Sequence, residues 1–167
     1  MKFRRPRGLA PMPCPQRGGS LDDLKPFVNC RAEDFPLVVG WIIGTFSPGP
    51  YPALIFQGEQ GTAKTTTAKI LKSMVDPGHT PQRTAPRDVR DLMISGANSW
   101  CLSFDNLSIL PNWLSDSLCR LATGGGLSTR ELYSDSDETI LDAMRPVILN
   151  GIDSLVSRAD LADRAIL

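Results

Sequence analysis

Eight residues of the chain, from Gly58 to Thr65, have the spacing of a phosphate-binding loop. Their sequence, GEQGTAKT, fits the pattern G-x-x-x-x-G-K-[ST] everywhere except at Ala63, where a glycine is usual. Such a loop works because backbone N–H groups, and the dipole at the start of the following helix, converge on phosphate oxygens. We expect Lys64 to reach the β- and γ-phosphates of a nucleotide and the Thr65 hydroxyl to bind magnesium.

The loop must surround the phosphates from several sides, so we expect nucleotide contacts along its whole length: Gly58, Glu59, Gln60, Gly61, Thr62, Ala63, Lys64, Thr65 and Thr66. Gly58 and Gly61 provide the backbone freedom that a tight turn needs. At Ala63 the one extra methyl group is expected to be a small change. The competing interpretation is a turn rich in glycine and threonine that joins a strand to a helix and binds nothing.

Two further polar residues follow a buried apolar segment later in the chain. Residues 100–104 predict a strand that ends at Asp105 and Asn106. We expect this to be a neighbouring strand, with Asp105 holding the magnesium ion through water. Asn106 stands where a glutamate base is common; its amide can orient a water molecule but cannot accept a proton. The alternative for this pair is an Asx turn that closes the strand.

Asn150 ends a third apolar segment, Val147–Asn150, and is followed by Gly151. A polar side chain at the end of such a strand is expected beside the γ-phosphate, where it can hold the attacking water. The alternative is an Asn-Gly turn with no part in chemistry.

The elements that must position these residues alternate between strands and helices, which predicts an α/β domain with a mainly parallel sheet. The expected strands are 53–57, 100–104 and 147–150, and the expected helices are 35–46, 64–75, 86–94, 111–122 and 152–167. A strand is the alternative for 35–46, because Val, Ile and Trp suit one. Residues 127–133 and 139–143 flank an acidic turn and predict an inserted hairpin. Residues 1–19 predict an irregular arm before a single domain, 20–167.

Composition excludes several classes of protein. The 167 residues carry 18 basic and 18 acidic side chains, so no strong field for a polyanion arises from net charge. The longest apolar stretch is about half the length that a membrane span needs, roughly 20 residues, and no signal segment follows the basic start. Four widely spaced cysteines argue against a zinc site or disulfide framework and predict reduced thiols in a cytoplasmic protein without membrane contact.

The order of these motifs resembles that of AAA+ P-loop ATPases. With the hairpin at 127–143, the chain looks most like the helicase-type ATPase domains of phages, plasmids and integrated elements, including superfamily 3 and primase-associated helicases. The blocks 18–29, 121–126 and 145–152 also resemble ATP-binding proteins of bacterial mobile elements. The resemblance implies a P-loop NTPase fold, Mg²⁺ and ATP as cofactors, and a homo-oligomeric ring.

Carried over by position, the resemblance makes Lys64, Thr65, Asp105 and Asn150 catalytic or metal-binding. Arg164 matches the arginine that reaches into the neighbouring subunit's ATP site, and Arg158 is the second choice. A surface salt bridge from Arg164 to Asp160 or Asp163 is the alternative. The family would continue past Leu167 with a further strand and a helical lid. We therefore expect a fragment, a truncated reading frame or one piece of a split protein, with an apolar sheet edge left open.

The sequence thus favours ATP hydrolysis coupled to unwinding or remodelling of single-stranded or duplex DNA, with a primase or another replication protein as partner. The rival interpretations are an ATP-binding switch with little turnover, which Asn106 and the missing lid favour, and a non-functional remnant. Arg120 and Arg130 near the hairpin are candidates for DNA contacts. The acidic turn and the neutral net charge argue instead for a solvated loop.

Overall fold

The computed structural model describes residues 6, 8–130, 138–141, 144–152, 155–156 and 158–167. In chain order its elements are the 3₁₀ helix η1 (Leu21–Phe27), α1 (Phe35–Gly44), β1 (Ala53–Gln57), α2 (Lys64–Val75), α3 (Val89–Asn98), β2 (Leu102–Leu107), α4 (Asn112–Thr123), β3 (Leu127–Arg130), β4 (Glu138–Leu141), β5 (Val147–Gly151), α5 (Ala159–Ala162) and β6 (Ala165–Ile166).

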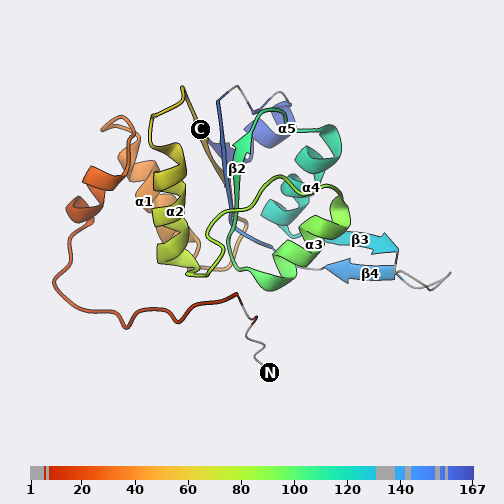
Figure 1. Ribbon diagram of the computed structural model, residues 1–167, viewed down its shortest axis with the longest axis horizontal. Helices are drawn as coiled ribbons and strands as arrows, with labels where there is room; N and C mark the ends of the chain where they lie inside the picture. The colour runs from red at the N-terminus through yellow and green to blue at the C-terminus, as the bar shows by residue number, and fades with distance from the viewer. Residues whose placement is uncertain (1–5, 7, 131–137, 142–143, 153–154, 157) are drawn as a thin grey trace.

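Four of these strands form one parallel sheet in the order β2-β5-β1-β6. Figure 1 shows α1 and α2 on one side of this sheet and α3 and α4 on the other. Strand β5 lies in the middle and is buried along its whole length, as expected for an apolar strand covered on both faces. Strands β3 and β4 form a separate antiparallel hairpin, in which Leu127 pairs with Leu141. The predicted α/β class, the mainly parallel sheet and the inserted hairpin are confirmed. Residues 134–137 of the predicted acidic turn lie outside the described residues, and Glu138, its last residue, begins β4.

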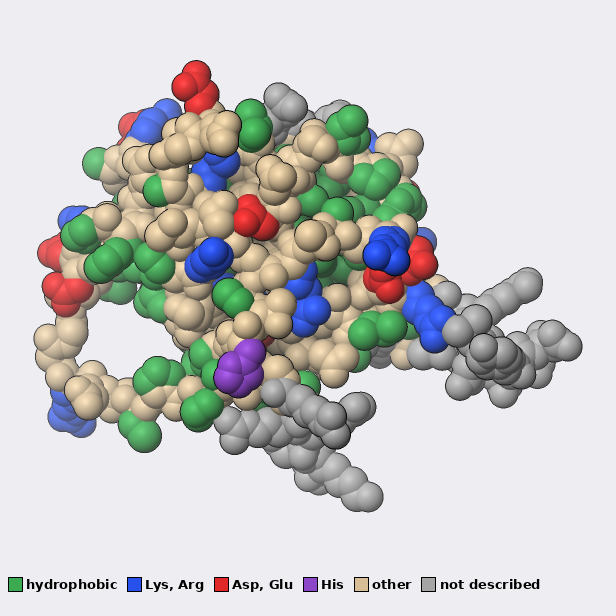
Figure 2. Space-filling model, in the orientation of Figure 1, with side chains coloured by type: hydrophobic (Ala, Val, Ile, Leu, Met, Phe, Trp, Pro, Cys, Tyr) green, Lys and Arg blue, Asp and Glu red, His purple; other side chains and the backbone are tan. Residues whose placement is uncertain are grey.

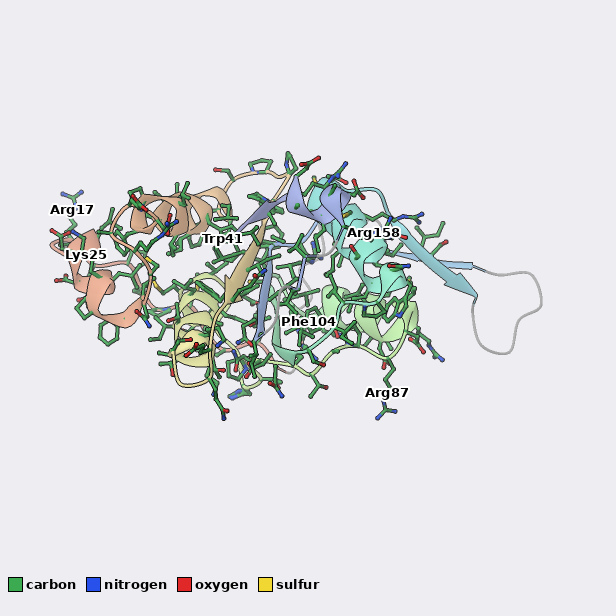
Figure 3. The ribbon with its side chains drawn as sticks, turned by 90° about the horizontal axis from the view of Figure 1, so that it is seen from above. Arg17, Lys25, Trp41, Arg87, Phe104 and Arg158 are labelled. Carbon is green, nitrogen blue, oxygen red and sulfur yellow. The ribbon has the colours of Figure 1, made fainter. Side chains whose placement is uncertain are left out.

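Helices cover both faces of the sheet and create two apolar cores. One core joins η1, α1 and α2 to the sheet through residues such as Leu24, Trp41, Leu71 and Ile148. The other joins α3, α4 and the hairpin to the opposite face through residues that include Phe104, which lies between the sheet and these helices in Figure 3. The result is a three-layer domain whose strand ends are held in fixed positions.

The N-terminal part of the domain follows its local signals closely. The Ser20 side chain accepts a hydrogen bond from Asp22 N and completes a capping box with Asp23, although the element that follows is a 3₁₀ helix. Residues 35–44 form a helix, so the alternative of a strand is wrong there, and Asp34 makes no side-chain cap. Trp41 is buried, whereas Trp100 is 39% exposed.

Three expected boundaries differ in the structure. Helix α3 begins at Val89, where Asp88 caps it, instead of at residue 86. Strand β2 runs on to Leu107 and therefore contains Asp105 and Asn106. The interval 152–167 is not one helix: only α5 is helical, and Ala165–Ile166 pairs with β1 as a short strand. The sequence predicted an open apolar sheet edge without naming the strand, and in the structure β6 covers part of the edge of β1.

Residues 8–10 of the N-terminal arm attach to the main body by backbone hydrogen bonds. Ala10 N donates to Pro77 O at 2.9 Å, and His79 N donates to Gly8 O at 3.0 Å. From residue 11 to residue 19 the arm is exposed throughout, and Figure 2 shows it as a separate band of atoms with an opening beside the main body. No helix in the described part of the chain is long and apolar enough to span a membrane.

A buried ion pair ties the end of α2 to the start of the sheet. Lys72 Nζ lies 2.8 Å from Asp76 Oδ2, and the two side chains are 4% and 3% exposed. Asp76 Oδ2 also accepts the backbone N–H of Cys101 at 3.0 Å. The carboxylate thus satisfies both a cation and a backbone donor, which is what a buried charge requires.

Candidate functional site

The carboxyl ends of β1, β5 and β2 open into a cleft of about 640 Å³, which lies within the usual size range of small-molecule sites. The sequence predicted that the strand carrying Asp105 would be the neighbour of β1. This is wrong, because β5 lies between β1 and β2. The cleft is lined by residues from the loop and from both other strand ends: Gln60, Gly61, Thr62, Ala63, Lys64, Thr65, Thr66, Asp105, Asn106, Asn150, Gly151 and Ile152.

The loop between β1 and α2 has the backbone that a tight anion-binding turn requires. Gly58 and Gly61 have φ values of 148° and 85°, which confirms the need for glycine at both positions. Ala63 has φ 62° and ψ 13°, in the left-handed region, directly before α2. An L-residue with a Cβ pays roughly 1–2 kcal/mol for this conformation. The extra methyl group is therefore a strained substitution and not the small change that the sequence predicted.

Lys64 lies over the loop that precedes it. Its Nζ donates to Gly58 O at 2.7 Å and to Glu59 O at 2.6 Å, and it contacts Thr62 Oγ1 at 3.2 Å. Gly58 and Glu59 do not line the cleft, and their carbonyl groups accept the hydrogen bonds that hold the Lys64 side chain. The ammonium group is half-buried at the mouth of α2, where the helix dipole and the loop N–H groups also favour an anion.

Thr65 and Asp105 are 40 positions apart in the sequence and are in contact in the cleft. The Thr65 hydroxyl donates to Asp105 Oδ1 at 3.0 Å, so the two side chains expected to share a metal ion are in contact. A hydroxyl and a carboxylate are hard oxygen ligands of the kind that Mg²⁺ prefers. The described residues contain no group of three or more His, Cys, Asp or Glu side chains suited to a metal. The Thr65 hydroxyl and the Asp105 carboxylate thus fit an ion that keeps water and substrate oxygens as its other ligands.

Asn106 and Asn150 are joined by a hydrogen bond. The Asn150 side chain is 2% exposed, and its Oδ1 accepts the backbone N–H of Asn106 at 2.8 Å. Its Nδ2 is buried and has no hydrogen-bond partner among the described residues, which leaves a donor on a residue that lines the cleft. Asn106 has φ 55°, a conformation that asparagine tolerates better than most residues, and its side chain is exposed. The left-handed backbone is a structural reason for asparagine at position 106, in addition to the Asx turn considered from the sequence.

The two arginines predicted to act across a subunit boundary both form ion pairs within the chain. Arg164 pairs with Asp160 and also donates to the Asp160 carbonyl at 2.7 Å, which matches the salt-bridge alternative. Arg158 pairs with Asp116 of α4 at 2.6 Å and lies beside that helix, on the opposite side of the sheet from α2 (Figure 3). Neither arginine lines the cleft of its own chain.

Two residues near the loop were missed by the sequence analysis. Asn29 Nδ2 donates to Thr62 O at 3.1 Å, and Gln82 Nε2 donates to Thr65 O at 3.2 Å. Both come from irregular segments with no motif of their own. No local sequence signal identifies such residues, because their contacts depend on how distant segments pack.

Comparison with protein families gives a match over residues 20–167 to the actinomycete integrative conjugative element replication proteins. The chain belongs to this family. The match begins where the irregular arm ends. The mobile-element context expected from the sequence is thus shown, and replication is the process that the family description names.

No curated protein matches the chain in sequence. Among solved structures, the chain is similar to the apo A form of the NrS-1 C terminal region, CTR(305-718), with 15% identity and a TM-score of 0.51. The likeness covers 90% of this chain but only 36% of that one, so the chain spans about a third of its neighbour. At this identity the likeness concerns the fold alone.

Proposed function

We propose that the chain is a P-loop NTPase domain that binds Mg-ATP in the cleft and hydrolyses it during replication of an integrative conjugative element. The observation that carries the proposal is the contact of Thr65 Oγ1 with Asp105 Oδ1, beside a loop whose Lys64 lies at the start of α2. This contact, together with the loop motif, supports the proposal of a site for a triphosphate and a divalent cation.

In this proposal each group has a defined task. The loop N–H groups and Lys64 bind the β- and γ-phosphates, and Thr65 and Asp105 hold the magnesium ion. When bound, the ion neutralises charge on the phosphate oxygens. Asn150 positions the attacking water or a γ-phosphate oxygen through its Nδ2, for which the described part of the chain offers no partner. Arg164, or Arg158 in its place, would supply charge to a neighbouring subunit's site in a ring.

A second candidate, an ATP-binding switch with little turnover, is favoured by one specific observation. Asp105 is the only carboxylate among the described residues that line the cleft, and its contact with the Thr65 hydroxyl suits a metal ligand better than a general base. Asn106 cannot accept a proton from water. Binding that drives assembly, with slow hydrolysis, is consistent with this arrangement.

The coupling to DNA rests on the family, whose description names replication. We propose single-stranded or duplex DNA as the substrate on which nucleotide turnover acts, together with a primase or another replication protein as partner. The net charge of zero indicates that DNA contacts are local and do not arise from a general electrostatic attraction.

Turnover measurements separate these candidates. Phosphate release is followed for the native chain and Lys64→Ala, with and without single-stranded DNA. Lys69→Ala is the matched control, because Lys69 is exposed on the same helix and does not line the cleft. Release that depends on Lys64 and rises with DNA supports the motor. Nucleotide binding without release supports the switch, and release that is the same in Lys64→Ala refutes the proposed site.

A further inference from the structure

The phosphate-binding loop is held from outside by a segment that no motif includes. Residues 27–29 run along the start of α2: Thr67 Oγ1 donates to Phe27 O at 3.2 Å, and Asn29 Nδ2 donates to Thr62 O at 3.1 Å. Leu24 and Val28, at 8% and 6% exposure, fix this segment in the core that it shares with α2. Asn29 is therefore an anchored group that contacts the loop.

The hydrogen bond from Asn29 acts on the peptide that precedes the strained residue. In a trans peptide the carbonyl and the N–H point in opposite directions. With Thr62 O turned toward Asn29, the N–H of Ala63 points away from Asn29. Ala63 lines the cleft, and its N–H is one of those that a phosphate-binding loop presents to its ligand.

Ala63 needs such support more than a glycine would. Its φ of 62° is costly for an alanine, whereas glycine adopts it freely. A loop with glycine keeps the binding conformation without help, but a loop with alanine is biased toward other conformations unless an external contact opposes the strain. Two side chains from outside the loop donate to its backbone among the described residues, Gln82 to Thr65 O and Asn29 to Thr62 O, and of these Asn29 acts on the peptide that precedes Ala63.

We propose that Asn29 is a positioning residue for nucleotide binding, which holds the Thr62–Ala63 peptide in its binding conformation and offsets the alanine at position 63. This inference rests on the proposed function of the cleft. It assigns to the segment before α1 a part in nucleotide affinity, and it accounts for how this chain tolerates alanine where the loop pattern has glycine.

The test is a double-mutant cycle between Asn29→Ala and Ala63→Gly, with the Kd of a fluorescent ATP analogue and magnesium as readout. In the native background, loss of the hydrogen bond is expected to raise Kd roughly three- to tenfold. In the Ala63→Gly background the same change is expected to raise Kd less than about twofold, because glycine needs no support. Equal increases in both backgrounds, or no increase in the native one, would overturn the proposal.

A control variant and a second readout make the result specific. Asn98→Ala removes a similar side-chain hydrogen bond, from Asn98 Nδ2 to Ile94 O at 2.7 Å, far along the chain in α3, and is expected to leave Kd unchanged. Hydrogen exchange of the peptide 58–63 without nucleotide gives a second readout. Asn29→Ala should speed exchange in the native background and not in the Ala63→Gly background. If Lys64→Ala leaves nucleotide binding intact, the proposed function fails, and the exchange experiment still decides the role of Asn29.

Discussion

Replacing Lys72 by methionine should destabilise the domain strongly, although Lys72 lies outside the cleft. The change removes one partner of a buried ion pair and leaves the Asp76 carboxylate, 3% exposed, with only the Cys101 N–H at 3.0 Å as a donor among the contacts of the described residues. Breaking such a pair on one side costs about 3–5 kcal/mol, because an uncompensated charge remains in the interior.

The assay is urea unfolding together with thermal melting. For a chain of this size each kcal/mol corresponds to about 2–4 °C in Tm, so Lys72→Met should lower Tm by at least about 6 °C. Lys69→Met, on the exposed side of the same helix, should change the free energy of unfolding by less than about 0.5 kcal/mol. The double variant Lys72→Met/Asp76→Asn should recover part of the loss. A cost below about 1 kcal/mol for Lys72→Met would refute the reasoning that this pair is buried and coupled.

The remaining predictions concern strain, thiol reactivity and close packing. Ala63→Gly should raise the free energy of unfolding by about 1 kcal/mol, measured by urea unfolding, because glycine relieves the left-handed backbone; a decrease would contradict the strain. Burial raises the pKa of Cys101 to about 12 and that of Cys119 to about 11, so both should stay protonated at about pH 8. Iodoacetamide followed by peptide mass spectrometry should then modify the exposed Cys14 first, and early modification of a buried thiol would count against the packing. Gly151→Ala should cost about 1–3 kcal/mol, because the new methyl group collides with a backbone carbonyl of β2; an unchanged Tm would show that this contact is not as close as described.

The central part of the fold was predictable because its signals are local. Apolar strands such as 53–57, the loop pattern at 58–65 and the glycine that ends α4 each act on their own neighbours. The C-terminal region was not predictable in the same way. Ala165–Ile166 is a strand only because the edge of β1 is available to pair with it, and a two-residue segment has no period of its own.

In the candidate site, too, the features set by local sequence signals were predictable, and those set by the packing of distant segments were not. The meeting of Thr65 with Asp105 followed from the motif and from the end of an apolar strand. The contact from Asn29 and the strain at Ala63 did not, because they depend on the packing of a distant segment and on a backbone angle. The exposure of Trp100 likewise depends on packing: its ring lies near the surface, where the Arg145 guanidinium stacks over it at 5.3 Å.

The most direct test of the account is the equilibrium binding of ATP, measured by calorimetry with and without magnesium. The native chain should bind more tightly with magnesium, and Asp105→Asn should lose that dependence. Lys64→Ala should weaken binding at least about tenfold, the effect of losing a hydrogen bond from a charged group. Lys69→Ala should bind as the native chain does. If Lys64→Ala binds ATP as tightly as the native chain, the loop from Gly58 to Thr65 does not hold a nucleotide.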